Sequence, residues 1–124
     1  MTIQNAIIKD GCGLAPQDAV SAKAFVQLLT IMYRSSNADA WIASLPVSGQ
    51  SGTLKSLCPN TALEGRIHAK SGTIAGTKNF AGYIDAPNGD TWVFAILINS
   101  APGKARNIQT VIQQYLLDVY KQHQ

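Results

Sequence analysis

Residues 80–99 read FAGYIDAPNGDTWVFAILIN, two apolar runs separated by Pro-Asn-Gly-Asp. An Asn-Gly pair between apolar runs is a strong hairpin signal, because both residues tolerate a positive φ angle. We therefore predict antiparallel strands over residues 80–85 and 91–99, joined by a tight turn. Residues 92–98 are apolar at every position, so we expect the second strand to be covered on both faces.

The segments on either side extend this hairpin into a small sheet with helices. Residues 66–71 alternate between apolar and polar side chains, which predicts a third strand. After the hairpin, apolar residues recur every three or four positions and predict a C-terminal helix packed against the sheet. The members of this stripe are Ile108, Val111, Ile112, Tyr115, Leu116, Val119 and Tyr120.

Two helices are predicted before the sheet. The first begins near Ser21, with Asp18 or Ser21 as its cap, and the second begins near Ser36 or Asn37. Pro46 ends the second helix, because proline disfavours helical geometry in the residue before it.

The remaining segments complete the predicted architecture. Residues 1–9 are mildly apolar, and we expect a helix there. Residues 10–16 hold two glycines and a proline and predict a tight loop. Residues 47–62 predict a long loop, a kind of segment that is often functional. The prediction is one α+β domain over residues 1–124, an antiparallel sheet of about three strands with a C-terminal helix packed on it and N-terminal helices.

The composition excludes several classes of function. Hydrophobic residues make up 46% and charged residues 14%, which argues against disorder. The net charge is +3, but the Lys and Arg residues are scattered, so we expect no nucleic-acid partner. Cys12 and Cys58 form no Cys-x-x-Cys pair, and the two histidines lie far apart, so we expect no metal and no cofactor. Both cysteines are interpreted as small buried hydrophobes, and the alternative interpretation is a Cys12–Cys58 disulfide in an oxidising compartment.

No targeting segment or membrane span is predicted. Residues 1–5 lack the basic start and long apolar stretch of a signal peptide. The longest apolar run, residues 92–98, is too short to cross a bilayer. As written, the chain would be expected in the cytoplasm.

The candidate binding site is the segment His-Ala-Lys-Ser-Gly-Thr-Ile at residues 68–74. Lys70 supplies a positive charge for a carboxylate, and Ser71 and Thr73 supply hydrogen bonds. Gly72 would allow close backbone approach, and an open N–H near Thr73 could face a developing oxyanion. The alternative interpretation is a short loop with a solvated lysine, because such tetrapeptides are common.

A Lys-Thr-Gly or Lys-Ser-Gly triplet on a strand that lines the active site is typical of penicillin-binding proteins and serine β-lactamases. The surrounding segments resemble the class C, low-molecular-weight penicillin-binding proteins, which are D-alanyl-D-alanine carboxypeptidases and endopeptidases. The matching segments, in the family's order, are residues 10–14 (Asp-Gly-Cys-Gly-Leu), 45–47 (Leu-Pro-Val), 52–54 (Gly-Thr-Leu), 63–73 (the approach to the triplet and the triplet itself) and 80–84 (Phe-Ala-Gly-Tyr-Ile).

This resemblance implies the C-terminal portion of a β-lactamase/transpeptidase-like fold, with a D-Ala-D-Ala peptide or a β-lactam as ligand. It also implies a periplasmic location for the intact family. In that family a serine attacks the terminal D-Ala-D-Ala peptide bond, and water then releases the acyl-enzyme. By resemblance, Lys70 would be catalytic and would bind the substrate carboxylate. Ser71 would hydrogen-bond that carboxylate beside Gly72, and the Thr73 N–H would form half of the oxyanion hole.

The sequence departs from the family's pattern at three points. Cys12 stands where the family has serine, and Ser71 stands where threonine is commoner. No serine is followed by a lysine three residues later, so the 124 residues contain no Ser-x-x-Lys nucleophile motif. Residues 35–37 read Ser-Ser-Asn and match the family's Ser-x-Asn motif by letters, but they lie downstream of residues 10–14 and at a predicted helix start. A capping role is expected there.

Three functional interpretations follow. The first is a portion of a serine-type cell-wall carboxypeptidase that is inactive alone. The second is a non-enzymatic binding or assembly module, which would associate with itself or with a complementing chain through exposed apolar surface. The third is a cysteine hydrolase that uses Cys12 and His68, which requires the two side chains to lie within hydrogen-bond reach.

Overall fold

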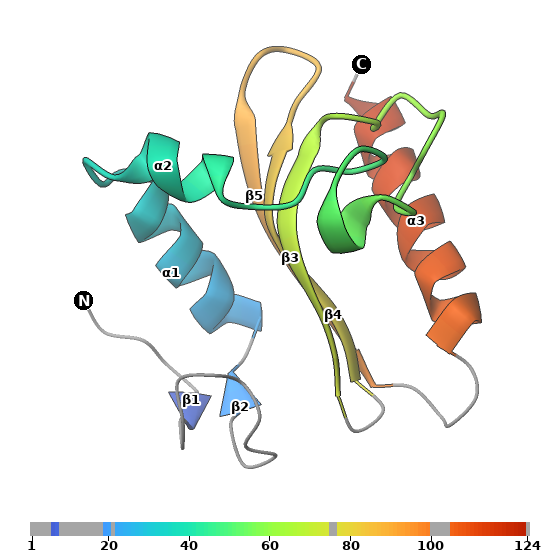
Figure 1. Cartoon of the computed structure of the whole chain (residues 1–124), viewed down its shortest axis with the longest axis horizontal. Helices are drawn as coiled ribbons and strands as arrows, with labels where there is room; N and C mark the ends of the chain where they lie inside the picture. The colour runs from blue at the N-terminus through green and yellow to red at the C-terminus, as the bar shows by residue number, and fades with distance from the viewer. Residues whose placement is uncertain (1–5, 8–18, 21, 75–76, 100–104, 124) are drawn as a thin grey trace.

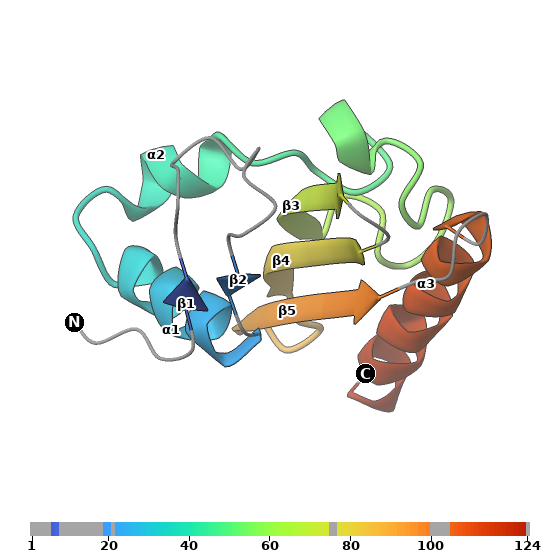
Figure 2. The ribbon, with the colours of Figure 1, turned by 90° about the horizontal axis from the view of Figure 1, so that it is seen from below.

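The computed structural model describes residues 6–7, 19–20, 22–74, 77–99 and 105–123. The fold is α+β, with a three-stranded sheet between helices (Figure 1). The elements in chain order are β1 (Ala6–Ile7), β2 (Ala19–Val20), α1 (Ala22–Tyr33), α2 (Ala38–Ala43), the 3-10 turn η1 (Gly52–Leu54), β3 (Ile67–Ile74), β4 (Thr77–Asp85), β5 (Thr91–Asn99) and α3 (Ala105–Gln122). Figure 2 shows α3 apart from α1 and α2, with the sheet between them.

The main sheet is antiparallel, with the strand order β3-β4-β5. The β4–β5 hairpin forms as its Asn-Gly pair predicts, with Gly89 at a φ angle of +91°. The Ala86 N–H donates to the Asp90 carbonyl at 2.8 Å and closes this turn. Both β3 and β4 are longer than predicted. β3 continues through the Lys-Ser-Gly-Thr segment, and β4 begins three residues before Phe80.

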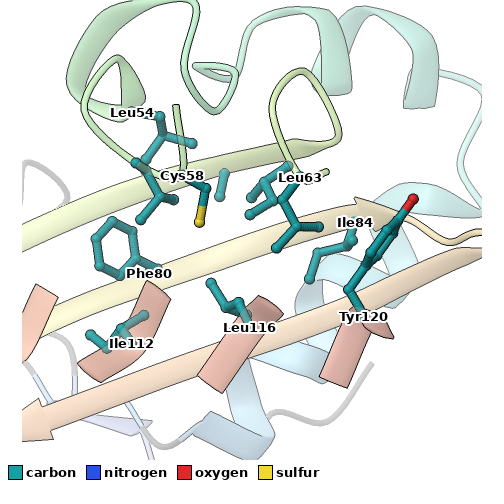
Figure 3. Close-up of a cluster of buried hydrophobic side chains, with 11 residues drawn as sticks. Leu54, Cys58, Leu63, Phe80, Ile84, Ile112, Leu116 and Tyr120 are labelled. Carbon is teal, nitrogen blue, oxygen red and sulfur yellow. The ribbon is translucent and has the colours of Figure 1, made fainter. Parts of the chain in front are cut away.

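One face of the sheet packs against α3 and the loop that carries η1. A cluster of buried apolar side chains fills this space (Figure 3). Its members are Leu54, Leu57, Cys58, Leu63, Ile67, Ala69, Phe80, Ile84, Ile112, Leu116 and Tyr120. The predicted C-terminal helix is therefore confirmed: Ile112, Leu116 and Tyr120 of the predicted stripe are buried against the sheet, whereas Val111 and Tyr115 are exposed.

The opposite face of the sheet packs against α1 and α2. Leu29, Leu45, Ala81 and Tyr83 form the buried cluster there, with Trp41 partly buried beside them. The two N-terminal helices are therefore confirmed, and α2 ends at Ala43, before the proline as expected.

β5 contributes to both clusters, as its continuous apolar run predicts. Trp92 and Phe94 pack on the α3 side, and Val93 and Ala95 pack on the α1 side. All four side chains remain partly exposed, because β5 is an edge strand of the main sheet.

One predicted element is wrong. Ala6 and Ile7 do not lie in a helix but form β1, which pairs antiparallel with β2. A run of apolar residues this short does not distinguish a strand from a helix, and the pairing partner lies a dozen residues away. The predicted tight loop at residues 10–16 and the cap at Asp18 or Ser21 lie outside the described residues. Among the helices described, none has the length and apolar character to cross a bilayer.

Candidate functional site

The candidate site lies at the outer edge of β3. The loop before η1 covers the first part of this edge: the Ser48 N–H donates to the Ile67 carbonyl at 2.9 Å, and the Ala69 N–H donates to the Pro46 carbonyl at 3.1 Å. Backbone groups of alternate residues in an edge strand point the same way. The N–H and C=O groups of Ser71 and Thr73 therefore point to this same edge, beyond the end of the loop's pairing.

Lys70 places its charge at this open edge. Its side chain is exposed, and its ammonium donates a hydrogen bond to the Ser71 carbonyl. Because that carbonyl points away from β4, the ammonium lies over the edge rather than over the sheet. The Lys70 ammonium therefore lies beside the backbone groups of β3 that point to this edge.

Ser71 does not present its hydroxyl directly to solvent. The residue is 8% exposed, and its Oγ donates to Thr53 Oγ1 at 2.8 Å. Thr53 belongs to η1 and is exposed. The Ser71 hydroxyl therefore reaches the surface through a second hydroxyl.

The position of η1 is fixed by packing and by local hydrogen bonds. Leu54 is 0% exposed in the α3-side cluster, and its carbonyl accepts from the Gly49 N–H at 2.9 Å. The Ser51 hydroxyl accepts from the Val47 N–H at 3.0 Å. These contacts hold Thr53 against β3, within the long loop predicted at residues 47–62.

Gly72 pairs with Asn79 of β4. A Cβ atom at Gly72 would lie 2.9 Å from Asn79 Oδ1, so the glycine leaves room for that side chain. The closer approach of a substrate to the Gly72 backbone stays a prediction.

His68 lies on β3 two residues before Lys70, which puts both on the same face of the strand. Its Nε2 lies 3.1 Å from Asp85 Oδ2 at the end of β4. The sequence pattern did not reveal this carboxylate partner. Cys12 lies outside the described residues, so the predicted pairing of Cys12 with His68 stays untested.

Two other sequence features have structural roles. Asn37 occupies the N-cap position of α2 without a side-chain cap hydrogen bond, and its N–H donates to Ser35 Oγ at 3.2 Å. This Ser-Ser-Asn turn lies at a helix start, as predicted, but the expected side-chain cap hydrogen bond is not formed. Cys58 is a free, buried thiol, and burial raises its pKa to about 11.

In the part of the chain that the structure describes, no group of His, Cys, Asp and Glu residues could hold a metal ion.

Sequence comparison identifies relatives for most of the chain. The D-Ala-D-Ala carboxypeptidase 3 (S13) family matches residues 1–119. A D-alanyl-D-alanine carboxypeptidase of Actinomadura sp. (strain R39) is 38% identical over 104 residues, which are 80% of this chain and 19% of the relative. The penicillin-sensitive carboxypeptidase A of Dictyostelium discoideum is 29% identical over 116 residues, 87% of this chain and 22% of the relative. The chain thus spans about a fifth of the length of these relatives.

Solved structures share the fold. Penicillin binding protein 4 of Haemophilus influenzae matches with a TM-score of 0.80 at 22% identity, over 96% of this chain and 28% of its own. The predatory endopeptidase Bd0816 of Bdellovibrio bacteriovorus, solved with an immunity protein, matches with a TM-score of 0.77 at 19% identity, over 96% of this chain and 33% of its own. The structures thus share the order of helices, strands and final helix. Because the family match extends over nearly all of its residues, the chain belongs to the D-Ala-D-Ala carboxypeptidase 3 (S13) family of penicillin-binding hydrolases.

Proposed function

We propose that this chain is the substrate-gripping portion of a serine-type D-Ala-D-Ala carboxypeptidase or endopeptidase of peptidoglycan metabolism. The observation that carries the proposal is the outer edge of β3 from Ser71 onward, where no described backbone group pairs with the strand and the Lys70 ammonium bonds the Ser71 carbonyl. A peptide can lie along such an edge as an added strand. Its terminal carboxylate then forms a charge-assisted hydrogen bond with Lys70.

The neighbouring residues support this assignment. The Ser71 hydroxyl lies beside the edge, and Gly72 keeps the strand free of a side chain between Ser71 and Thr73. The Thr73 N–H points to the same edge by strand alternation, where a donor can stabilise an oxyanion. A β-lactam is the second proposed ligand, since penicillin binding protein 4 of Haemophilus influenzae complexed with a β-lactam matches with a TM-score of 0.81.

The chain is proposed to bind without hydrolysing. None of its serines is followed by a lysine three residues later, so these 124 residues supply no Ser-x-x-Lys nucleophile. The proposed setting is the periplasm, the location that the family resemblance implies for the intact enzymes. Turnover of a D-Ala-D-Ala peptide by the pure chain would contradict the proposed inactivity.

Binding is tested by titrating the ¹⁵N-labelled chain with D-alanyl-D-alanine and following backbone amide shifts. Shifts are expected at Ser71, Gly72 and Thr73. Lys70→Met is expected to weaken binding about tenfold, since it removes a charge-assisted hydrogen bond. Lys23→Met removes an equal charge from the exposed surface of α1 and is the control. Equal binding by the two variants, or shifts confined to other residues, would contradict the proposed site.

A second candidate function, self-association, is favoured by the outer edge of β5. By alternation the N–H and C=O groups of Val93, Ala95 and Leu97 point away from β4, and no described residue pairs with them. β5 contains no charged residue and no proline, the usual protections of an edge strand. Antiparallel pairing of β5 with a second copy about Ala95 would satisfy these groups symmetrically.

Apolar side chains of α3 adjoin this edge. Val111 is 63% exposed and Tyr115 is 61% exposed, and both line a groove of about 270 Å³ with Ile96 and Ile98 of β5. If a second copy covers this groove, Val111→Glu with Tyr115→Glu shifts the chain from dimer to monomer in light scattering. Gln114→Glu on the exposed side of α3 is the control. A monodisperse wild-type monomer would contradict self-association.

A further inference from the structure

Thr53 lies at the candidate site although neither its sequence motif nor its residue type assigned it a role. Its Oγ1 accepts the hydrogen bond from Ser71 Oγ at 2.8 Å. The two hydroxyls come from different elements, η1 and β3, which lie 18 residues apart at this contact. The fold therefore brings the hydroxyls of Ser71 and Thr53 together.

Burial decides which of the two hydroxyls is available to a ligand. A hydroxyl has one proton to donate and rotates to suit its partners. With Ser71 donating to Thr53, the Thr53 proton is available to a ligand, and no residue that the structure describes accepts it. Thr53 is exposed and Ser71 is buried, so the free donor is the one that faces solvent.

The Lys70 ammonium and the Thr53 hydroxyl are bonded to the same residue. Lys70 bonds the carbonyl of Ser71, and Thr53 bonds its hydroxyl. A carboxylate accepts hydrogen bonds at two oxygens and donates none. Its two oxygens match the two donors that lie next to Ser71, and accepting from both leaves the Ser71–Thr53 bond intact. In such a chain each hydrogen bond polarises the next, which strengthens the hydrogen bond from Thr53 to the carboxylate.

We propose that Thr53 is a substrate-binding residue, whose hydroxyl donates to the terminal carboxylate of the bound peptide and holds the Ser71 hydroxyl in place. Ser71 then acts through Thr53 rather than on the carboxylate itself. This inference rests on the proposed function, because it assumes that the β3 edge binds a peptide that ends in a carboxylate.

The test compares two ligands, D-alanyl-D-alanine and its C-terminal amide, in the same amide-shift titration. Thr53→Val keeps the shape of the side chain and removes the hydroxyl, and it is expected to weaken binding of the acid about tenfold. The amide keeps one carbonyl acceptor but carries no negative charge, so Thr53→Val is expected to weaken binding of the amide less than binding of the acid. Thr53→Ser restores the hydroxyl and is expected to recover binding of the acid.

Controls separate this role from a purely structural one. Ser36→Ala removes an exposed hydroxyl from the turn between α1 and α2 and is expected to leave binding unchanged. If wild type and Thr53→Val bind the acid equally well, the proposed role of Thr53 is contradicted while the proposed function of the chain stands. If Thr53→Val loses acid and amide to the same degree, the residue supports the loop and the inference is also overturned. If wild type binds neither ligand, the proposed function fails, and the inference fails with it.

Discussion

The indole N–H of Trp41 donates a hydrogen bond to the hydroxyl of Tyr83 at 2.9 Å, which ties α2 to the middle strand of the sheet. The same hydroxyl donates to the Leu29 carbonyl of α1 at 2.6 Å. One buried side chain thus connects both N-terminal helices to β4. Burial raises the pKa of Tyr83, and the Trp41 hydrogen bond opposes this rise.

Tyr83→Phe is expected to lower the free energy of unfolding by about 3 kcal/mol, because it leaves the Trp41 N–H and the Leu29 carbonyl without a partner. Urea unfolding followed by tryptophan fluorescence measures the change. Tyr33→Phe is the matched control: Tyr33 is 43% exposed, and its hydroxyl makes one long hydrogen bond of 3.3 Å. Similar losses in the two variants would contradict the role of Tyr83 as the central connection.

Gly82→Ala is expected to be among the most disruptive single changes in the sheet. A Cβ atom there would lie 2.1 Å from the His68 carbonyl oxygen and 2.6 Å from the Ala69 Cα, and neither backbone atom can move without parting β3 from β4. Overpacking of this kind costs about 3 kcal/mol or more. Gly72→Ala meets the tip of the Asn79 side chain, which can rotate away, so a smaller loss is expected. Chemical denaturation of both variants checks this order.

Cys58 is expected to make stability depend on pH in alkaline solution. Its pKa rises from 9.0 to about 11 on folding, so the unfolded chain loses the thiol proton first. The neutral thiol therefore favours the folded state fully below pH 9, and this contribution is lost as the pH rises from 9 to 11. Unfolding measured across this range is expected to show a shallower decline for Cys58→Ala than for wild type. Identical slopes would contradict burial of the thiol.

Leu54→Ala is expected to affect both stability and binding. It removes a side chain that is 0% exposed, at a cost of about 3 kcal/mol, and loosens η1 under Thr53. Leu28→Ala, at a 38% exposed position of α1, is the control. We expect weaker binding of D-alanyl-D-alanine by folded Leu54→Ala than by Leu28→Ala. Unchanged binding would show that the position of η1 does not matter to the site.

The parts of the fold that the sequence predicts well are those encoded locally. The turn at Gly89 follows from two adjacent residues that tolerate positive φ, and α3 follows from a long apolar stripe. The two residues of β1 have no such local signal, since their strand exists through pairing with β2. Ala6 and Ile7 therefore form a strand where the sequence predicts a helix, because their pairing partner is distant in the sequence.

The candidate site divides in the same way. Lys70 and Ser71 are visible in the sequence because they are neighbours in one recognisable triplet. Thr53 and Asp85 are not visible as partners, because their contacts with Ser71 and His68 span 18 and 17 residues. The Ser71–Thr53 contact depends on how the loop before β3 packs, with Leu54 buried in the core as its anchor. The His68–Asp85 contact depends on the pairing of β3 with β4.

We propose that this chain binds substrate at the outer edge of β3 and contains no Ser-x-x-Lys nucleophile. The most direct test is the intact mass of the pure protein before and after incubation with a penicillin. We expect the mass of the protein to be unchanged, because no serine stands in a Ser-x-x-Lys motif. A mass increased by that of the drug would contradict it, and peptide mapping would then identify the acylated residue, with Cys12 examined first.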